Sequence, residues 1–333
     1  GINLKRSGES DFIVFDKEAG VGGTWWVNDY PGCACDVESH LYSFSFELNP
    51  EWSRLYARQQ EIQRYLEACV EKYGLAPHLR LETEITSMAW EEAERRWRLT
   101  DAHGNQTTAD VVVSGIGGLS APYYPDIPGL ASFQGRCFHS QQWDHDYPLE
   151  GKRVAVIGTG ASVIQFVPQI QRKVERLDLY QRTPPWIVPK PDRRISEREQ
   201  ERFRRYPLVQ KALRAGIYCM LEGRVFGFAL HPKLMEYPKR VALRHLERQV
   251  PDPEMRRKLT PDYSFGCKRV LISNDFYPAL SKPNVHLLTD GIREVRPHGV
   301  VDGNGVEREV DAIILGTGFR AADPIPAGMV RGR

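Results

Sequence analysis

The chain contains 333 residues, of which 41% are hydrophobic and 26% charged, so it is long enough for two domains with separate cores. Its 45 Lys and Arg against 43 Asp and Glu leave a net charge of +2, which gives no electrostatic case for binding nucleic acid or an anionic membrane. The apolar stretches near Val111 and Ala312 are too short for a membrane span of about 20 residues, and no secretory signal pattern is visible.

The N-terminal residues have the pattern of a helix end followed by a strand. Residues 1–8 read as the last turns of an amphipathic helix stopped by Gly8, and residues 11–16 form an apolar strand that ends in an acid. In a dinucleotide-binding unit the acid at this place hydrogen-bonds a ribose hydroxyl. We therefore expect Asp16 to read a ribose and the sequence to begin inside the first helix of such a unit. The alternative is that Asp16 caps a strand of another α/β fold.

The residues up to 130 predict a loop, a helix and several short strands. A Gly- and Pro-rich loop covers 21–36, and a helix with one apolar face is predicted from about Gln59 to Tyr73. A Pro-rich connector follows at 122–128. The predicted strands between helix and connector are Leu79–Thr83, Thr86–Trp90, Trp97–Thr100 and Ala109–Val113.

A second strand–turn–helix–strand unit begins at Gly151. Buried strands are predicted at 153–157 and 177–180, with a glycine turn and a helix at 161–171 between them. Such a turn lets the backbone approach a pyrophosphate, which then lies on the helix N-terminus. The predicted pyrophosphate-binding residues are Gly158, Thr159, Gly160, Ala161 and Ser162. Val163 is bulkier than the Gly or Ala usual at its position, which predicts looser packing of helix on strand.

The second strand of this unit ends at Arg182 and Thr183, where a residue that reads the ribose belongs. An acid there favours NAD, whereas an Arg pairs with the 2′-phosphate of NADP. The sequence therefore predicts NADPH as a cofactor. The alternative is that Arg182 is an ordinary surface charge.

The C-terminal half predicts a helical insertion within the second unit. Charged and apolar residues alternate at helical spacing from Ile195 to Pro261, as a cover over a site or as packing alone. Strand patterns return at 285–288 and 292–295, with a turn at 302–305. A last buried strand from Asp311 runs into the glycine turn 316–318.

Two longer patterns, one on each side of the connector, add a family resemblance. The first comprises Gly22, Gly23, Thr24, Trp25, Tyr30, Pro31, Gly32 and Asp36. The second comprises Phe133, Gly135, His139, Trp143 and Asp144. Together they resemble the two fingerprints of the Baeyer–Villiger monooxygenases, a branch of the flavin-containing monooxygenase superfamily. Gly316-Thr317-Gly318 is similar to a late Ala-Thr-Gly segment of the superfamily, with Gly in place of Ala.

The resemblance implies an α/β fold with two dinucleotide-binding, Rossmann-like domains of parallel sheets. Residues 1–130 would form the FAD domain, 131–150 a linker with the second fingerprint, and 151–320 the NADPH domain with its helical insertion at about 190–262. Residues 321–333 would begin a return to the FAD domain. The FAD pyrophosphate loop would precede Gly1, so we expect this chain alone to hold little FAD.

The resemblance also implies the chemistry: a flavin C4a-peroxide inserts one oxygen atom, converting a ketone to an ester with O2 and NADPH. Arg269 would stabilise the peroxide and the adduct as anions, Asp36 would orient it, and Lys268 would bind phosphate. Arg269 could instead contact only the nicotinamide phosphate. His139 would couple the two domains rather than transfer protons, and Trp143 would anchor an interface.

Two other functions stay open at this point. One is an oxygenase of the same superfamily that acts on amine nitrogen or sulfide sulfur. The other is a non-catalytic NADP-binding fragment. The six Cys show neither a pairing framework nor metal-ligand spacing, so we expect reduced thiols, no metal and a cytoplasmic protein whose partners are small molecules.

Overall fold

The computed structural model describes residues 1–225, 227, 231–322 and 324–332, and the chain forms two compact units. Unit 1 comprises Gly1–Asp29, Gln60–Tyr123 and Phe319–Arg333. Unit 2 comprises Tyr30–Gln59 and Tyr124–Gly318. No helix in the described ranges is both long and apolar enough to cross a membrane.

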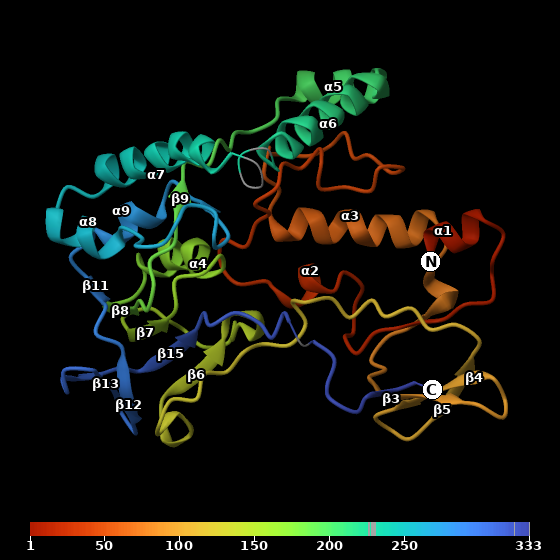
Figure 1. The fold of residues 1–333 in the computed structure, drawn as a ribbon, viewed down its shortest axis with the longest axis horizontal. Helices are drawn as coiled ribbons and strands as arrows, with labels where there is room; N and C mark the ends of the chain where they lie inside the picture. The colour runs from red at the N-terminus through yellow and green to blue at the C-terminus, as the bar shows by residue number, and fades with distance from the viewer. Residues whose placement is uncertain (226, 228–230, 323, 333) are drawn as a thin grey trace. The chain divides into compact units, whose positions relative to one another are not determined.

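Unit 1 contains a two-stranded and a four-stranded sheet (Figure 1). The small sheet is parallel, and the larger one has the order β16-β3-β4-β5 with only β16 and β3 parallel. Its elements are α1 (Ile2–Arg6), β1 (Val14–Phe15), α2 (Thr24–Val27), α3 (Gln59–Lys72), a 3-10 turn (Ala76–His78), β2 (Leu79–Arg80), β3 (Ile85–Glu91), β4 (Arg96–Asp101), β5 (Gln106–Ala109) and β16 (Val330–Arg331).

Two expectations for unit 1 have opposite outcomes. The helix stop at Gly8 is confirmed, since α1 ends at Arg6 and Gly8 has a φ of +89°. The predicted strand Ala109–Val113 is wrong, because β5 ends at Ala109. Val111 and Val113 are 75% and 87% exposed, so these two apolar side chains are not packed against the described part of the chain.

Unit 2 is built around a five-stranded, all-parallel sheet with the order β11-β8-β7-β15-β6 (Figure 1). The sheet strands are β6 (Arg136–His139), β7 (Arg153–Ile157), β8 (Arg176–Tyr180), β11 (Val285–Leu288) and β15 (Ala312–Leu315). The central strands are buried on both faces, as parallel strands covered by crossover connections require. The α/β class predicted from the sequence is confirmed by this sheet.

The other elements of unit 2 flank or interrupt that sheet. The antiparallel sheet β12-β13-β14 precedes β15, and β9 pairs with β10 in parallel. These elements are α4 (Val163–Ile170), β9 (Ile187–Val188), α5 (Glu197–Arg205), α6 (Pro207–Glu222), α7 (Glu236–Gln249), α8 (Pro253–Leu259), β10 (Leu271–Ile272), α9 (Phe276–Leu280), β12 (Ile292–Arg296), β13 (Gly299–Asp302) and β14 (Glu307–Glu309), with 3-10 turns at Leu130–Ser132, Ser140–Gln142 and Pro232–Met235.

Local sequence explains where the inserted helices begin. Ser196 accepts a hydrogen bond from the Glu199 N–H while the Glu199 carboxylate bonds the Ser196 N–H, a capping box at the start of α5. Asp252 caps α8 by accepting from two backbone N–H groups. The helices α5 to α8 lie within the segment predicted to be helical, of which residues 226 and 228–230 are outside the described residues.

Residues 30–59 and 136–139 differ from the sequence-based division. Residues 30–59 group with unit 2 because the Gln165 amide on α4 bonds the Tyr30 hydroxyl (3.0 Å) and both backbone groups of Ala34 (3.0 and 3.3 Å). Residues 136–139, predicted as part of a linker, form β6 at the edge of the parallel sheet. The short segment Arg136-Cys137-Phe138-His139 has no apolar run that would predict a strand.

Candidate functional site

The glycine turn between β7 and α4 has a crowded side and an open side. Gly158 has a φ of +111°, and a Cβ on it would lie 2.4 Å from the carbonyl oxygen of Gly316, so no other residue fits there. A Cβ on Gly160 would meet no heavy atom within 4 Å. Ala161 and Ser162 follow at the N-terminus of α4, where backbone N–H groups have no partner within the helix. This open helix N-terminus suits an anionic phosphate.

Val163 and Gly316 fit each other. Val163 is fully buried in the first turn of α4, and its Cγ2 lies 2.1 Å from where a Cβ on Gly316 would stand. The expected looser packing at Val163 is therefore not what the structure has: the missing side chain at position 316 makes room for the larger one at 163. The two departures from the family pattern compensate each other.

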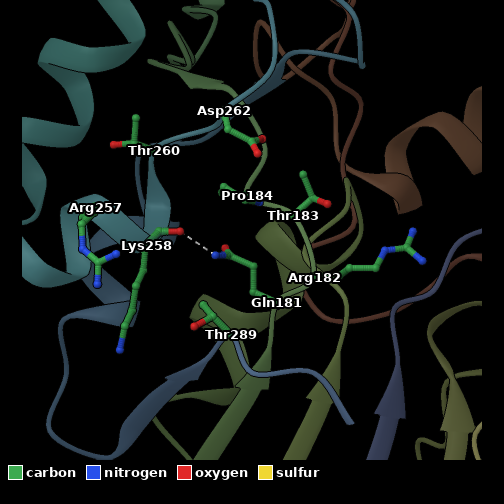
Figure 2. Close-up of a pocket in the computed structure, with 9 residues that line it drawn as sticks. All are labelled: Gln181, Arg182, Thr183, Pro184, Arg257, Lys258, Thr260, Asp262 and Thr289. Atoms are coloured by element: carbon green, nitrogen blue, oxygen red, sulfur yellow. Dashed lines mark hydrogen bonds between the residues drawn. The ribbon is translucent and has the colours of Figure 1, made fainter. Parts of the chain in front are cut away.

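A pocket of about 310 Å³ lies at the carboxyl end of β8, beside the glycine turn (Figure 2). Thr159 connects the two, because its hydroxyl donates to the Thr183 carbonyl oxygen (3.1 Å). The pocket is lined by Gln181, Arg182, Thr183, Pro184, Arg257, Lys258, Thr260, Asp262 and Thr289. In Figure 2 Arg182 extends away from Arg257 and Lys258, so cationic side chains lie on two sides of the pocket.

The chemistry of this pocket suits a phosphorylated ligand with hydrogen-bond donors. Three cationic side chains and one carboxylate line it. Gln181 is 3% exposed and donates from Nε2 to the Lys258 carbonyl oxygen (2.7 Å), while its Oε1 is buried with no hydrogen-bond partner among the described residues. A buried acceptor without a partner is costly, which favours a ligand that donates to it. Arg257 and Lys258 were not predicted, and the basic run at the end of the helical insertion was the available signal.

Asp36 and Arg269, 233 residues apart in the sequence, form an ion pair in unit 2. The Arg269 guanidinium donates to Asp36 Oδ2 at 2.5 Å, and the two side chains are 63% and 25% exposed. Arg269 lies just before β10, which is fixed to β9 by the bond from Leu271 N–H to the Trp186 carbonyl oxygen (2.8 Å). The carboxylate is fixed by its neighbour, since Cys35 N–H donates to the Ala57 carbonyl oxygen (2.9 Å). Backbone hydrogen bonds therefore hold the segments that carry Arg269 and Asp36, and the Arg269 side chain is exposed to solvent.

Tyr30 and Lys190 surround this pair. Burial raises the pKa of Tyr30 far above its ordinary value, and the nearby charge of Asp36 adds to the effect. The Tyr30 hydroxyl donates to Gln165 Oε1 (3.0 Å) on α4, the helix that follows the glycine turn. Burial lowers the pKa of Lys190, opposed by the negative charges of Asp192 and Asp36, and its Nζ lies 5.2 Å from the centroid of the Tyr56 ring. Lys190 is a cation of the site that the sequence analysis missed.

Lys268 is exposed, and its Nζ lies 4.6 Å from the centroid of the Tyr263 ring. Lys268 is not among the described residues that line the pocket, although Tyr263 follows the lining residue Asp262. Its expected role in phosphate binding stays a prediction.

The second fingerprint builds the edge strand β6 and its surroundings. A Cβ on Gly135 would lie 2.5 Å from the Asp311 carbonyl oxygen and 2.6 Å from the Phe133 ring, so this close contact requires Gly. His139 is fully buried; its Nδ1 accepts from Gln141 N–H and its Nε2 lies 3.1 Å from the Gly318 carbonyl oxygen. Since the carbonyl can only accept, Nε2 carries the proton.

Burial lowers the pKa of His139, a packed side chain beside Gly318, where the chain leaves unit 2 after β15. Trp143 packs between two aromatic rings of unit 2, at 5.3 Å from Phe138 and 5.2 Å from Phe166 between ring centroids. These contacts lie within unit 2, and the expected roles of His139 in coupling the two domains and of Trp143 at an interface stay predictions.

Four residues at the start of the first fingerprint, 22–25, lie in unit 1, as does Asp16. Asp16 follows β1, and one of its carboxylate oxygens accepts from Glu18 N–H (3.0 Å). Gly22 and Gly23 have φ values of +126° and +52° and precede α2, whose first residues are Thr24 and Trp25. No heavy atom lies within 4 Å of a Cβ built on Gly23, so this turn is open as well.

Comparison with known proteins explains this combination of glycine turns and fingerprints. Residues 14–202, more than half of the chain, match the family model described as flavin-binding monooxygenase-like. The chain belongs to the flavin-binding monooxygenase-like family. A Baeyer–Villiger monooxygenase of Pseudomonas aeruginosa is 64% identical over 332 residues, which cover 100% of this chain and 63% of that relative. The chain therefore spans somewhat less than two thirds of this relative's length.

Solved structures of the family agree with the fold. A cyclohexanone monooxygenase from Rhodococcus sp. Phi1 bound to NADP+ superposes with a TM-score of 0.85 at 32% identity, covering 100% of this chain and 71% of the other. OTEMO in complex with FAD and NADP gives a TM-score of 0.88 at 28% identity, again with 100% and 71% coverage. The resemblance to Baeyer–Villiger monooxygenases that the two fingerprints predict is confirmed by these matches.

Proposed function

We propose that this chain carries the NADPH-binding unit and the oxygen-inserting residues of an FAD- and NADPH-dependent monooxygenase that converts a ketone to an ester. The observation that carries the proposal is the Asp36–Arg269 ion pair, formed by one residue of the first fingerprint and one that follows the helical insertion.

The residues of unit 2 fit NADPH. The open turn at Gly160 and the N-terminus of α4 would hold the pyrophosphate. Arg182 would hold the 2′-phosphate, and the Gln181 amide oxygen would accept from the adenosine group. NADH lacks the 2′-phosphate and would not make this contact with Arg182.

Unit 1 contains residues that fit part of FAD. Asp16 at the end of β1 has the place and the charge of an acid that binds a ribose hydroxyl. The turn at Gly22 and Gly23 faces Gln63, whose Oε1 is buried with no partner among the described residues and would accept a ligand hydrogen bond. When bound and reduced by NADPH, FAD supplies the electrons that activate O2.

Arg269 and Asp36 then have separate roles. A guanidinium keeps its charge at any physiological pH, so Arg269 stabilises the negative charge that develops on the carbonyl oxygen of the ketone without donating a proton outright. Asp36 holds the guanidinium in one orientation through the 2.5 Å bond. Loss of one such oxyanion-stabilising donor costs roughly 10²–10³ in rate. The cytoplasmic location is part of the same proposal and rests on the cysteine pattern alone.

The test compares Arg269→Ala and Arg269→Lys with the unaltered protein, each loaded with FAD to an occupancy measured by flavin absorbance and supplied with NADPH, O2 and a ketone. We expect ester formation to fall at least about 10²-fold in the Ala variant and to recover only in part with Lys, because its point charge cannot reproduce the planar fork. NADPH binding should be unchanged, since Arg269 is not among the pocket residues. Ester at a near-normal rate from Arg269→Ala would contradict the proposal, and product from a sulfide or an amine alone would favour the other oxygenases of the family.

A further inference from the structure

Helix α6 holds the segment that follows Asp36 through two side chains one helical turn apart. Arg214 Nη1 lies 3.1, 2.6 and 3.1 Å from the carbonyl oxygens of His40, Leu41 and Ser43. Gln210 Nε2 donates to the Asn49 carbonyl oxygen at 2.7 Å and lies 3.1 Å from His40 Nδ1. Residues four apart share one face of a helix, so α6 presents a single polar face to residues 40–49.

Arg214 is half-buried, whereas the Gln210 side of this contact is buried, so its hydrogen bonds restrict the conformation of the segment. Gln210 and His40 are each 2% exposed. The His40 ring packs edge-on against Phe203 of α5, with 4.7 Å between ring centroids. A buried amide or carbonyl that loses its partner carries a desolvation cost, so alternative conformations of residues 40–49 would leave several polar groups unsatisfied.

The held segment is continuous with Asp36. Asp36 lies between two backbone anchors, where Cys35 N–H donates to Ala57 (2.9 Å) and Ser39 N–H donates to Leu55 (2.7 Å). A turn starts immediately afterwards, since the Glu38 carbonyl oxygen accepts from both Leu41 and Tyr42 at 2.9 Å. The carbonyl groups that bond Arg214 belong to this turn and to the residue after it. Arg214 thus fixes the turn that directly follows the segment carrying the Asp36 carboxylate.

We propose that Arg214 and Gln210 are positioning residues that fix the turn after Asp36 and thereby hold its carboxylate against Arg269. Neither residue needs to touch substrate or cofactor. The catalytic consequence rests on the function proposed above, whereas the effect on the segment itself rests on these contacts alone. The helical insertion then has a defined role, because it supports the acid of the ion pair.

The first experiment measures hydrogen exchange of backbone amides in residues 36–49 of the 333-residue chain. We expect Arg214→Met to raise exchange there about 10- to 100-fold, because hydrogen bonds to a charged donor are lost. Arg214→Lys should restore part of the protection, and Gln210→Ala should act in the same direction. The matched control is Lys211→Met, an exposed cation on the same helix, which should change nothing. Equal exchange in Arg214→Met and the control, with α6 intact, would overturn the proposal.

The second experiment is a double-mutant cycle in the FAD-reconstituted protein. If Arg214 acts through Asp36, Arg214→Met should lower the rate of ester formation about tenfold in the unaltered background and have no further effect in Asp36→Asn, with NADPH affinity unchanged in both. Independent, additive losses would contradict the proposal. Absence of any ester from the unaltered protein with bound FAD would refute the proposed function instead, and the exchange experiment would then decide on the positioning role alone.

Discussion

The contact between Val163 and Gly316 allows a quantitative prediction about the glycine turn. In Gly316→Ala the new Cβ would lie 2.1 Å from Val163 Cγ2, whereas carbon atoms normally approach to about 3.5–4.0 Å. About 1.5 Å of movement is therefore needed. Val163 is fully buried and β-branched, so its χ1 angle is stiff, and position 316 is fixed by its N–H bond to the Ile157 carbonyl oxygen (2.9 Å). We expect a loss of about 1–3 kcal/mol in the free energy of unfolding.

A second substitution should remove this strain. In Val163→Ala the Cγ2 atom is gone, and the next atoms near the new Cβ are the Ile157 carbonyl oxygen at 3.4 Å and Val163 Cβ at 3.6 Å, which are ordinary contacts. Val163→Ala alone leaves a cavity and should cost about 1–3 kcal/mol. In the double variant the methyl group introduced at position 316 refills part of that space, so we expect its loss to be smaller than the sum of the single losses by at least about 1 kcal/mol.

Urea unfolding of the four proteins, followed by circular dichroism, gives these differences, and hydrogen exchange in β7 assigns them to unit 2. Gly160→Ala is the control, because its Cβ would meet no heavy atom within 4 Å and stability should not change. A Gly316→Ala variant as stable as the unaltered chain, or strictly additive losses in the double variant, would refute the predicted clash.

The remaining predictions concern the nucleotide site and pH. Arg182→Ala should weaken NADPH binding roughly 10- to 100-fold and leave NADH binding unchanged, as measured by titration calorimetry; equal losses would make Arg182 structural. Gly160→Ala should weaken both nucleotides, because its methyl group occupies the open side of the turn; unchanged affinities would place the pyrophosphate elsewhere. Burial lowers the pKa values of His40 and His139 in the folded chain. In the unfolded chain the pKa of a histidine is about 6.5, so below that pH the unfolded chain binds more protons than the folded chain. Stability should therefore fall as pH decreases below about 6.5, and urea unfolding of the His→Gln variants should show a smaller slope with pH.

The sequence predicted the parts of unit 2 that depend on local pattern. The strand Arg153–Ile157 and the glycine turn follow from an apolar run, two glycines and a helical period, and the structure has β7, the turn and α4 there. Arg182 could be predicted because its place is set by counting along the same unit. The family resemblance added the Asp36 and Arg269 candidates, and the structure brings these two side chains into contact.

What the sequence could not predict depends on contacts between distant segments. β6 is a strand because β15 pairs with it, and nothing within residues 136–139 indicates that partner. Arg257 and Lys258 become pocket residues only because α8 lies next to the end of β8, which is fixed by the bond between the Gln181 side chain and the Lys258 carbonyl oxygen. The fit of Val163 to Gly316 likewise requires two positions that are far apart in the chain.

Isotope labelling of the product tests the proposed function most directly. The FAD-reconstituted protein is supplied with NADPH, a ketone and ¹⁸O2, and the product is analysed by mass spectrometry. The proposal predicts an ester that contains one ¹⁸O atom, formed in a ratio of about one to the NADPH consumed. Oxidation of NADPH without any labelled ester, by protein whose flavin absorbance shows bound FAD, would contradict it.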